Sequence, residues 1–174
     1  MQYVETIELE NDDRYIVSKI NSEMLSADFR INLNITPDLT IQYWGQPYLF
    51  SGNYSEFKKV TNSMSDNYND RFYTFTENEI SYNENDLIYS IDENQDGNVD
   101  YSFDDPNFNF FEFRSNLVLR WEYIPGSTVY VVWSQGRTGD NSYGEFNFKD
   151  DMNDLYSIVP HNVFLIKFSY RISI

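Results

Sequence analysis

The sequence predicts an all-β fold, an antiparallel up-and-down meander of five to six strands that forms part of a larger β-barrel. Three observations support this prediction: segments in which apolar and polar residues alternate, two short turns, and two long polar connections. Alternation indicates strands, because a strand points successive side chains to opposite faces of its sheet. No run of about twenty apolar residues occurs, which excludes a transmembrane helix.

Alternation is clearest in the segment from Val163 to Ile174. One parity is wholly apolar or aromatic and consists of Phe164, Ile166, Phe168, Tyr170, Ile172 and Ile174. Between them lie Lys167, Ser169, Arg171 and Ser173. We therefore expect a strand with one apolar face and one polar, cationic face. Such a strand is typical of an outer-membrane barrel, whose outer face contacts lipid and whose inner face contacts water.

Two hairpins follow the same plan. In the first, residues 27–35 and 39–49 alternate on either side of Thr36-Pro37-Asp38, a sequence that favours a turn. Pro47 lacks a backbone donor, so we expect a bulge or the outer end of the strand near it. Tyr15 to Ile20 extends the first strand, and Gln2 to Ile7 is the stub of an earlier one.

The second hairpin joins residues 111–123 to residues 128–135 through Pro125-Gly126-Ser127. Both parities of its second strand are apolar. With the closing strand at about 162–174, the sequence predicts five strands.

The connections between the strands are unequal in length. Those at 36–38 and 125–127 are short, whereas those at roughly 51–110 and 137–160 are long and polar. With the C-terminus on the periplasmic side, both turns fall on that side and both long loops are extracellular, as in outer-membrane barrels. A soluble antiparallel sandwich is the alternative, but it gives no reason for both long loops to share one end.

Five or six strands cannot close a barrel, since bacterial barrels begin at eight strands. We therefore expect an open, curved sheet with two bare edges. The segment Met1 to Ile7 lacks the basic and apolar regions of a secretory signal. We expect the whole chain, residues 1–174, to be the C-terminal fragment of a β-barrel domain whose signal peptide lies upstream.

Composition narrows the function. There are 28 acidic and 12 basic residues, a net charge of -16, so binding to nucleic acid is excluded and cations are the expected small partners. Cysteine is absent, which removes disulfides and thiol catalysis. One histidine, His161, argues against a histidine metal site or a Ser-His-Asp triad, and we interpret it as a loop residue.

The sharpest motif lies in the long acidic loop at 51–110 and resembles a calcium loop of the EF-hand type. Its oxygen ligands would be Asp92, Asn94, Asp96, the Asn98 carbonyl and Asp100, with Gly97 at the sharp turn. Phe103 stands where the bidentate glutamate belongs, and Asp104 or Asp105 could replace it. An acidic turn without metal is the alternative.

Other residue groups point to weaker hypotheses. The adjacent pairs Asp104-Asp105 and Asp150-Asp151 are candidates for glycoside hydrolysis, but their side chains would diverge on an extended backbone, and we expect no catalysis by this segment. Charges on the inward parities suggest cross-strand pairs in a wet lumen: Asp28, Arg30, Arg120, Glu122, Lys167 and Arg171. Aromatic residues near strand ends suggest interfacial girdles: Trp44, Tyr48, Trp121, Tyr123, Trp133 and Tyr170.

Several stretches resemble one family. They begin at Arg30 (RINLNITPDLTIQYWGQPY), Asp104 (DDPNFNF), Phe113 (FRSNLVLRWEYIPGST), Trp133 (WSQGR) and His161 (HNVFLIKFSY). Together they resemble the C-terminal end of the domain of unknown function 5916 family. These are large Bacteroidetes-type proteins in which a signal peptide and a family-9-like carbohydrate-binding module precede an outer-membrane barrel. The resemblance implies that this chain lacks the module and most of the strands. The family is sometimes labelled a membrane-associated hydrolase, and ending in Ile174 departs from the usual aromatic barrel signal.

We therefore expect the C-terminal segment of an outer-membrane protein associated with extracellular carbohydrate. The expected partners are outer-membrane lipid, the barrel-assembly machinery and, through the missing upstream module, a glycan. One alternative is a soluble β-sandwich whose loop aromatics stack on sugars: Tyr68, Phe72, Tyr73 and Tyr143. The other is part of a hydrolase, which would need two converging carboxylates.

Overall fold

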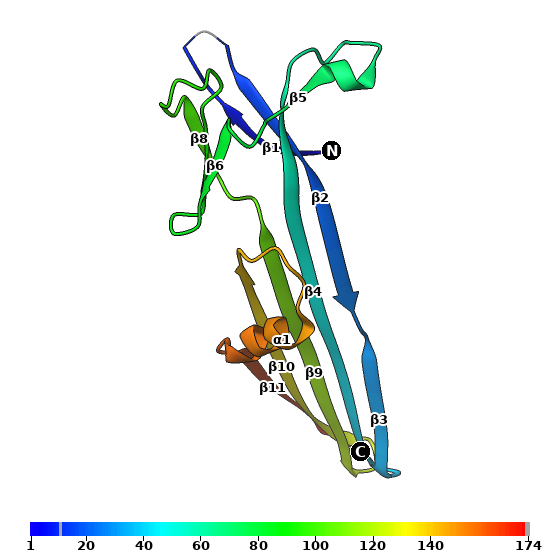
Figure 1. Cartoon of the computed structure of the whole chain (residues 1–174). Helices are drawn as coiled ribbons and strands as arrows, with labels where there is room; N and C mark the ends of the chain where they lie inside the picture. The colour runs from blue at the N-terminus through cyan, green and yellow to red at the C-terminus, as the bar shows by residue number, and fades with distance from the viewer. Residues whose placement is uncertain (11, 173–174) are drawn as a thin grey trace. The chain divides into compact units, whose positions relative to one another are not determined.

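The computed structural model describes residues 1–10 and 12–172, and it is all-β and antiparallel as predicted (Figure 1). In chain order, the strands are β1 (Gln2–Ile7), β2 (Arg14–Ser26), β3 (Phe29–Thr36), β4 (Leu39–Val60), β5 (Phe72–Thr74), β6 (Ile80–Asn83), β7 (Ile88–Ile91), β8 (Tyr101–Asp104), β9 (Phe108–Ile124), β10 (Ser127–Asn141) and β11 (His161–Ser169). A 3₁₀ turn, η1 (Tyr68–Arg71), and a helix, α1 (Phe148–Ser157), complete the elements. No helix among the described residues has the length and apolar character needed to cross a membrane.

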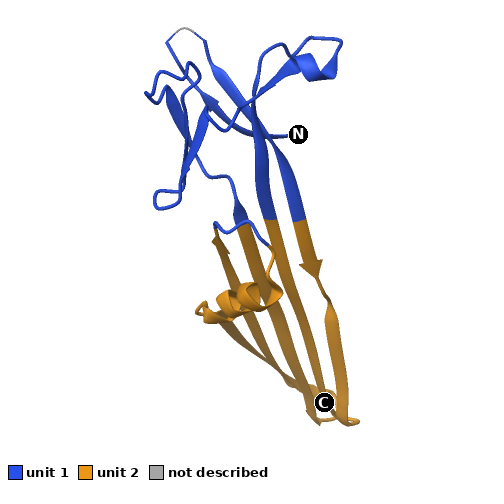
Figure 2. Ribbon diagram, in the orientation of Figure 1, with its two compact units in different colours: residues 1–22, 52–108, 142–145 blue, residues 23–51, 109–141, 146–174 orange. Residues whose placement is uncertain are grey.

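The chain divides into two compact units (Figure 2). Unit 1 consists of residues 1–22, 52–108 and 142–145, and unit 2 of residues 23–51, 109–141 and 146–174. The main sheet has the order β1-β2-β4-β9-β10-β11, with β3 and β5 also paired to β4. A second sheet, β6-β7-β8, lies in unit 1.

Unit 2 contains both predicted hairpins. Thr36 pairs with Leu39 at the end of the β3–β4 hairpin, and Ile124 pairs with Ser127 at the end of the β9–β10 hairpin. Gly126 has φ +82°, a left-handed conformation that costs glycine least. The Glu122 N–H donates to the Asp38 carbonyl at 2.8 Å, which places both turns at the same end of the unit, here called the turn end. The chain leaves unit 2 at the opposite end, after Ser51 and after Asn141, so both long connections start at one end of the unit, as predicted.

Pro47 lies inside β4, opposite the gap between β2 and β3, the two strands that pair with the same side of β4. The Ala27 N–H donates to the Pro47 carbonyl at 3.2 Å. In an antiparallel pair the N–H and C=O of a residue point to the same neighbour, so the donor that Pro47 lacks would have faced this edge. The edge changes from β2 to β3 here, at Ala27 and Asp28. The predicted irregularity is therefore present in the partner strand, while β4 continues to Val60.

The two connections predicted as long loops, at 51–110 and 137–160, contain strands and a helix. β4 continues to Val60 and β9 starts at Phe108, and β5 to β8 lie between them. β10 continues to Asn141 and is followed by α1. Of the predicted closing strand, β11 ends at Ser169, Tyr170 to Ile172 lie outside a strand, and Ser173 and Ile174 lie outside the described residues.

Unit 1 has its own hydrophobic core, which holds its short strands together. Buried residues from β2, β4, β7 and β8 meet in it, together with Phe75: Ile16, Phe57, Ile91, Tyr101 and Phe103. The rings of Phe57, Tyr89 and Phe103 contact one another: the Phe57 centroid is 4.5 Å from that of Tyr89 and 5.2 Å from that of Phe103, and Tyr89 stacks on Phe103 at 5.3 Å. Aromatic pairs at these distances add to the stability that burial provides.

The Ile91→Ala variant should therefore lose about 2–5 kcal/mol of unfolding free energy, because Ile91 is fully buried and the cavity would be lined by rigid rings. Urea denaturation followed by near-UV circular dichroism measures this loss. Val99→Ala is the matched control: Val99 is 61% exposed, so a change within about 0.5 kcal/mol is expected. Equal losses in both variants would contradict the assigned core.

Candidate functional site

The unit 2 sheet has one apolar face, which we call the apolar band. Directly opposed residues of antiparallel strands point to the same side of a sheet. The register of β9, β10 and β11 therefore aligns three apolar rows: Leu117–Trp133–Phe164, Leu119–Val131–Ile166 and Trp121–Val129–Phe168. On the other edge, Ile31 and Leu33 of β3 oppose Tyr43 and Ile41 of β4. The band thus extends from both edges of the sheet.

Most of the apolar band is bare. Phe164 is 70% exposed, Ile166 74% and Phe168 64%, and Ile31, Leu33 and Ile35 on β3 are about half exposed. Large apolar side chains on adjacent strands make a contiguous patch, and soluble monomers seldom expose such a patch. The band is therefore a candidate interaction surface.

Aromatic contacts mark two levels of the band. Trp133 stacks on Phe164 with centroids 5.9 Å apart, and its indole N–H donates to Asn162 at 2.9 Å. Nearer the turn end, Tyr123 stacks on Phe168 at 5.5 Å. Aromatic rings with a polar group at hand suit a membrane–water interface. Trp44 and Tyr48, which were predicted for the same girdles, lie on the opposite parity of β4.

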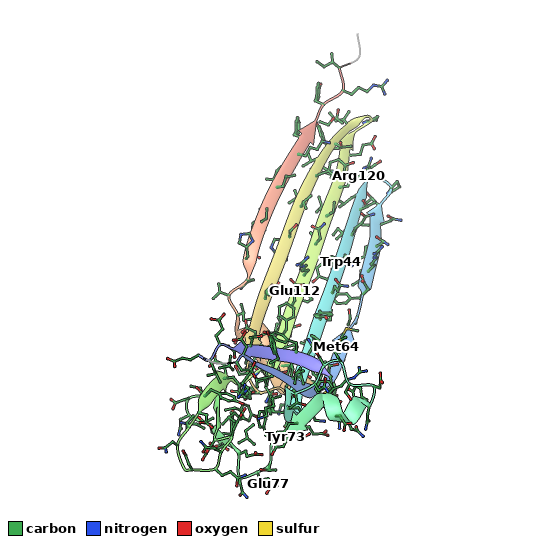
Figure 3. The ribbon with its side chains drawn as sticks, turned by 90° about the horizontal axis from the view of Figure 1, so that it is seen from above. Trp44, Met64, Tyr73, Glu77, Glu112 and Arg120 are labelled. Atoms are coloured by element: carbon green, nitrogen blue, oxygen red, sulfur yellow. The ribbon has the colours of Figure 1, made fainter. Side chains whose placement is uncertain are left out.

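The opposite face is mixed: it carries charged and amide side chains and one apolar row, Val118–Val132–Leu165. Arg30, Asn32, Gln42, Trp44 and Asn116 line a hollow of about 380 Å³ on it. Figure 3 shows the side chains of Trp44 and Arg120 on their strands. The indole N–H of Trp44 donates to Asp28.

Ion pairs on this face differ from the prediction. Within unit 2, three pairs of described residues join positions two apart on or beside one strand, rather than neighbouring strands: Arg30–Asp28 at 4.0 Å, Arg114–Glu112 at 2.7 Å and Arg120–Glu122 at 2.8 Å. Same-face neighbours at i and i+2 explain this, because they too lie within reach of a long side chain. Across strands, Lys167 lies over the Tyr130 ring, with Nζ 6.0 Å from its centroid.

His161 does not lie in a loop as predicted. It is the first residue of β11, where it pairs with Gly136 of β10. It lines a second hollow of the polar face with Trp44, Arg114 and Ser134.

Helix α1 covers the end of the apolar face away from the turns. Its Leu155 is fully buried against Leu49, Phe111 and Phe113. Asn147 caps the helix by accepting the N–H groups of Lys149 and Asp150. Sequence reasoning missed this element, although the Asn147 cap and the spacing of Met152 and Leu155 were readable signals.

The members of the two proposed carboxylate pairs have separate hydrogen-bond partners. Asp151 is buried and accepts from the Asn109 side chain at 2.9 Å, whereas Asp150 accepts from Asn147 at 2.7 Å. Asp105 accepts from the Tyr82 hydroxyl at 2.6 Å. These partners hold the carboxylates in structural roles.

The loop from Asp92 to Asp100 is a compact turn in unit 1. The Asp92 carboxylate accepts the N–H groups of Asp96 at 3.2 Å and Gly97 at 2.8 Å. Asp96 accepts the Asn98 N–H at 2.8 Å, and Asp100 accepts the Glu93 N–H at 2.7 Å. Within residues 1–10 and 12–172, no three carboxylate or histidine side chains converge as a metal-binding group. The predicted ligands are near one another in the turn, but their oxygens face backbone amides.

Glu93, inside the same turn, ties it to the rest of unit 1. It accepts hydrogen bonds from Arg14 of β2 at 3.1 Å, Lys59 of β4 at 2.9 Å and the hydroxyl of Tyr101 of β8. Burial alone would raise the pKa of Glu93, but the bonds from Tyr101, Lys59 and Arg14 outweigh it, so its pKa lies below the usual value. Burial, followed by the bond to Glu93, raises the pKa of Tyr101. The composition of the loop gave no sign of this centre.

The loop aromatics proposed for sugar stacking already have contacts with neighbouring side chains. Tyr68 packs edge-on against Phe72 at 5.4 Å. Tyr73 donates to Glu79 at 2.7 Å and lies under Lys59. Tyr143 is 75% exposed. These rings do not form one platform in the contacts described.

Comparisons with protein-family models, curated proteins and solved structures find no match. The two faces of the unit 2 sheet are therefore the features from which a function can be inferred.

The Glu93→Gln variant should lower the unfolding free energy of unit 1 by about 1.5–3 kcal/mol at pH 7, because three donors lose their anionic acceptor. A carboxyl whose folded pKa is depressed stabilises above its unfolded pKa, near 4.5, and this contribution disappears as pH falls through the folded pKa. The wild-type protein should therefore lose stability below about pH 4.5, and the variant should lose less over that range. Urea denaturation at several pH values tests this, with the exposed Glu77→Gln as control.

Calcium binding by Asp92, Asn94, Asp96, Asn98 and Asp100 stays a prediction. Isothermal titration calorimetry with calcium should give heat for the intact protein and none for Asp96→Ala, because oxygen ligands supply the affinity. Asp66→Ala, in a different connection, should leave the heat unchanged. No heat from the intact protein would refute calcium binding.

Proposed function

We propose that the chain is the C-terminal segment of an outer-membrane β-barrel protein, in which lipid contacts the apolar band of unit 2 and water wets the polar face. The observation that carries this proposal is the bare apolar parity of β11 beside the aligned rows of β9 and β10. A sheet exposed to water on both sides would lose the transfer free energy of these side chains. Lipid supplies the missing apolar surroundings.

Strand length and orientation support the same proposal. β10 has 15 residues, which at about 3.4 Å each and a tilt near 45° covers roughly 36 Å, more than the apolar height of about 25 Å in such barrels. With the turn end periplasmic, the segments that leave unit 2 at the other end are extracellular. The periplasmic turns are then the short ones, as in known barrels.

The soluble sandwich is less well supported. It would require a second layer over the apolar band, and among the described residues of unit 2 only α1 packs on this face, at the Leu49, Phe111 and Phe113 end. The middle rows remain exposed.

We infer a non-catalytic role for this segment, with insertion by the barrel-assembly machinery. Association with extracellular carbohydrate comes from the sequence resemblance, through a module upstream, and no residue of this chain is assigned to it. The resemblance to the domain of unknown function 5916 family is part of the same proposal.

Two neighbouring residues of β11 allow a matched test. Ile166 and Leu165 are adjacent, both exposed, and point to opposite faces. Arginine at a lipid-facing midplane position costs about 2–4 kcal/mol, whereas inward substitutions are tolerated. Expressed from the natural gene, Ile166→Arg should lower the amount of protein in the outer-membrane fraction several-fold, and Leu165→Arg should leave it near the wild-type amount.

Quantitative blotting of fractionated cells measures both variants against wild type. Recovery of the wild-type protein in the soluble fraction would overturn the proposal. Equal membrane recovery of the two arginine variants would overturn the assigned lipid face.

A further inference from the structure

The direction of each strand in unit 2 follows from the two hairpins. β3 and β9 run toward the turn end, and β4 and β10 run away from it. β11 is antiparallel to β10, with Ser169 opposite Thr128, so it too runs toward the turn end. The five strands side by side, β3-β4-β9-β10-β11, thus begin and end with strands of the same direction.

Both outer strands are open edges. Every residue of β3 and of β11 is exposed. Unpaired edges invite further strands, because their N–H and C=O groups lack partners on one side. In lipid such groups are too costly to leave unpaired, so a membrane-embedded sheet must close.

The directions restrict how the sheet can close. Joining β3 directly to β11 would create a parallel pair, whereas neighbours in bacterial outer-membrane barrels are antiparallel. A rotation axis that runs along the strands does not reverse their direction. If two copies related by such an axis paired β3 of one with β11 of the other, that pair would therefore be parallel as well. Antiparallel closure of five strands requires an odd number of additional strands. Because barrels begin at about eight strands, at least three are needed.

Unit 1 indicates where these strands come from. β1 pairs antiparallel with β2, with Ile7 opposite Arg14 and Gln2 opposite Ser18. The chain preceding Gln2 is therefore directed along β2 toward Ser22. β2 leads into β3 through Ala27 and Asp28, so a preceding strand that stays beside these residues has the antiparallel direction that the β3 edge requires.

We propose that the sheet is closed by an odd number of strands, at least three, from the same polypeptide upstream of Gln2, the last of them antiparallel to β3 and the first antiparallel to β11. This inference rests on the proposed membrane function and specifies the partner of its two open edges.

Cysteine cross-linking can test the inference, because these 174 residues contain no cysteine. In the protein expressed from its natural gene, Asn32→Cys on β3 is combined with single cysteines scanned through the upstream segment. We expect oxidation to form an intramolecular disulfide at one register. Moving the β3 cysteine to Asn34→Cys should shift the best upstream partner by two residues toward the N-terminus, since the strands are antiparallel. Leu165→Cys and Lys167→Cys should give the same shift on the β11 side, with a different upstream strand.

Outcomes separate this inference from the proposed function on which it rests. Three results obtained with protein from the membrane fraction would overturn the proposed closure and leave the membrane assignment intact. They are a shift of the best upstream partner toward the C-terminus, disulfides only between two copies, and no disulfide at either edge. A gene that encodes no residues before Met1 would overturn both proposals, because the chain would then not be the C-terminal segment of a longer protein. Recovery in the soluble fraction would overturn both. Asn32→Ser serves as the control that substitution at this position preserves membrane recovery.

Discussion

The two-faced character of unit 2 depends on the hydrogen-bond register between its strands. After a register shift between Ser127 and Thr128, β10 is paired residue by residue with β9 as far as Asn141, and with β11 from Thr128 to Gly136. Side chains alternate with a period of two, so a slip of one residue would move Phe164, Ile166 and Phe168 among the charges of the other face. Backbone hydrogen bonds do not distinguish apolar from polar side chains, yet the register that they set decides which side chains share a face.

Unit 1 is held together by a different balance. Its segments are rich in acidic residues, yet they are ordered by a compact aromatic core and by one carboxylate, Glu93, that receives three donors from three strands. Few basic residues are available in this part of the sequence, and Arg14 and Lys59 both converge on Glu93. The surplus of negative charge is left at the surface, where water screens it.

The sequence was sufficient for the hairpins, their turns and the apolar parity, because each is a local pattern of eight or more residues with a turn signal at its end. It was insufficient for unit 1, whose strands β5 to β8 have three or four residues each and are interleaved with polar ones. Their stability comes from contacts such as Phe57 with Phe103, which are distant in sequence. The apolar face was predicted, but its covering by α1 was not, because a short helix with three aspartates is stabilised here by Leu155 meeting Phe111 and Phe113. Trp44 was misplaced since aromatic character alone does not reveal a side chain's parity.

Helix α1 also bears on how this protein could be engineered. Exposed connections between strands are the usual places to shorten a chain or insert a tag, because most of them only join two strands. The connection between β10 and β11 is different: deleting it would uncover Leu49, Phe111 and Phe113 above the bare rows. An epitope or fusion partner is better placed beside Met64, whose side chain is 89% exposed, than anywhere between Phe146 and Ile158.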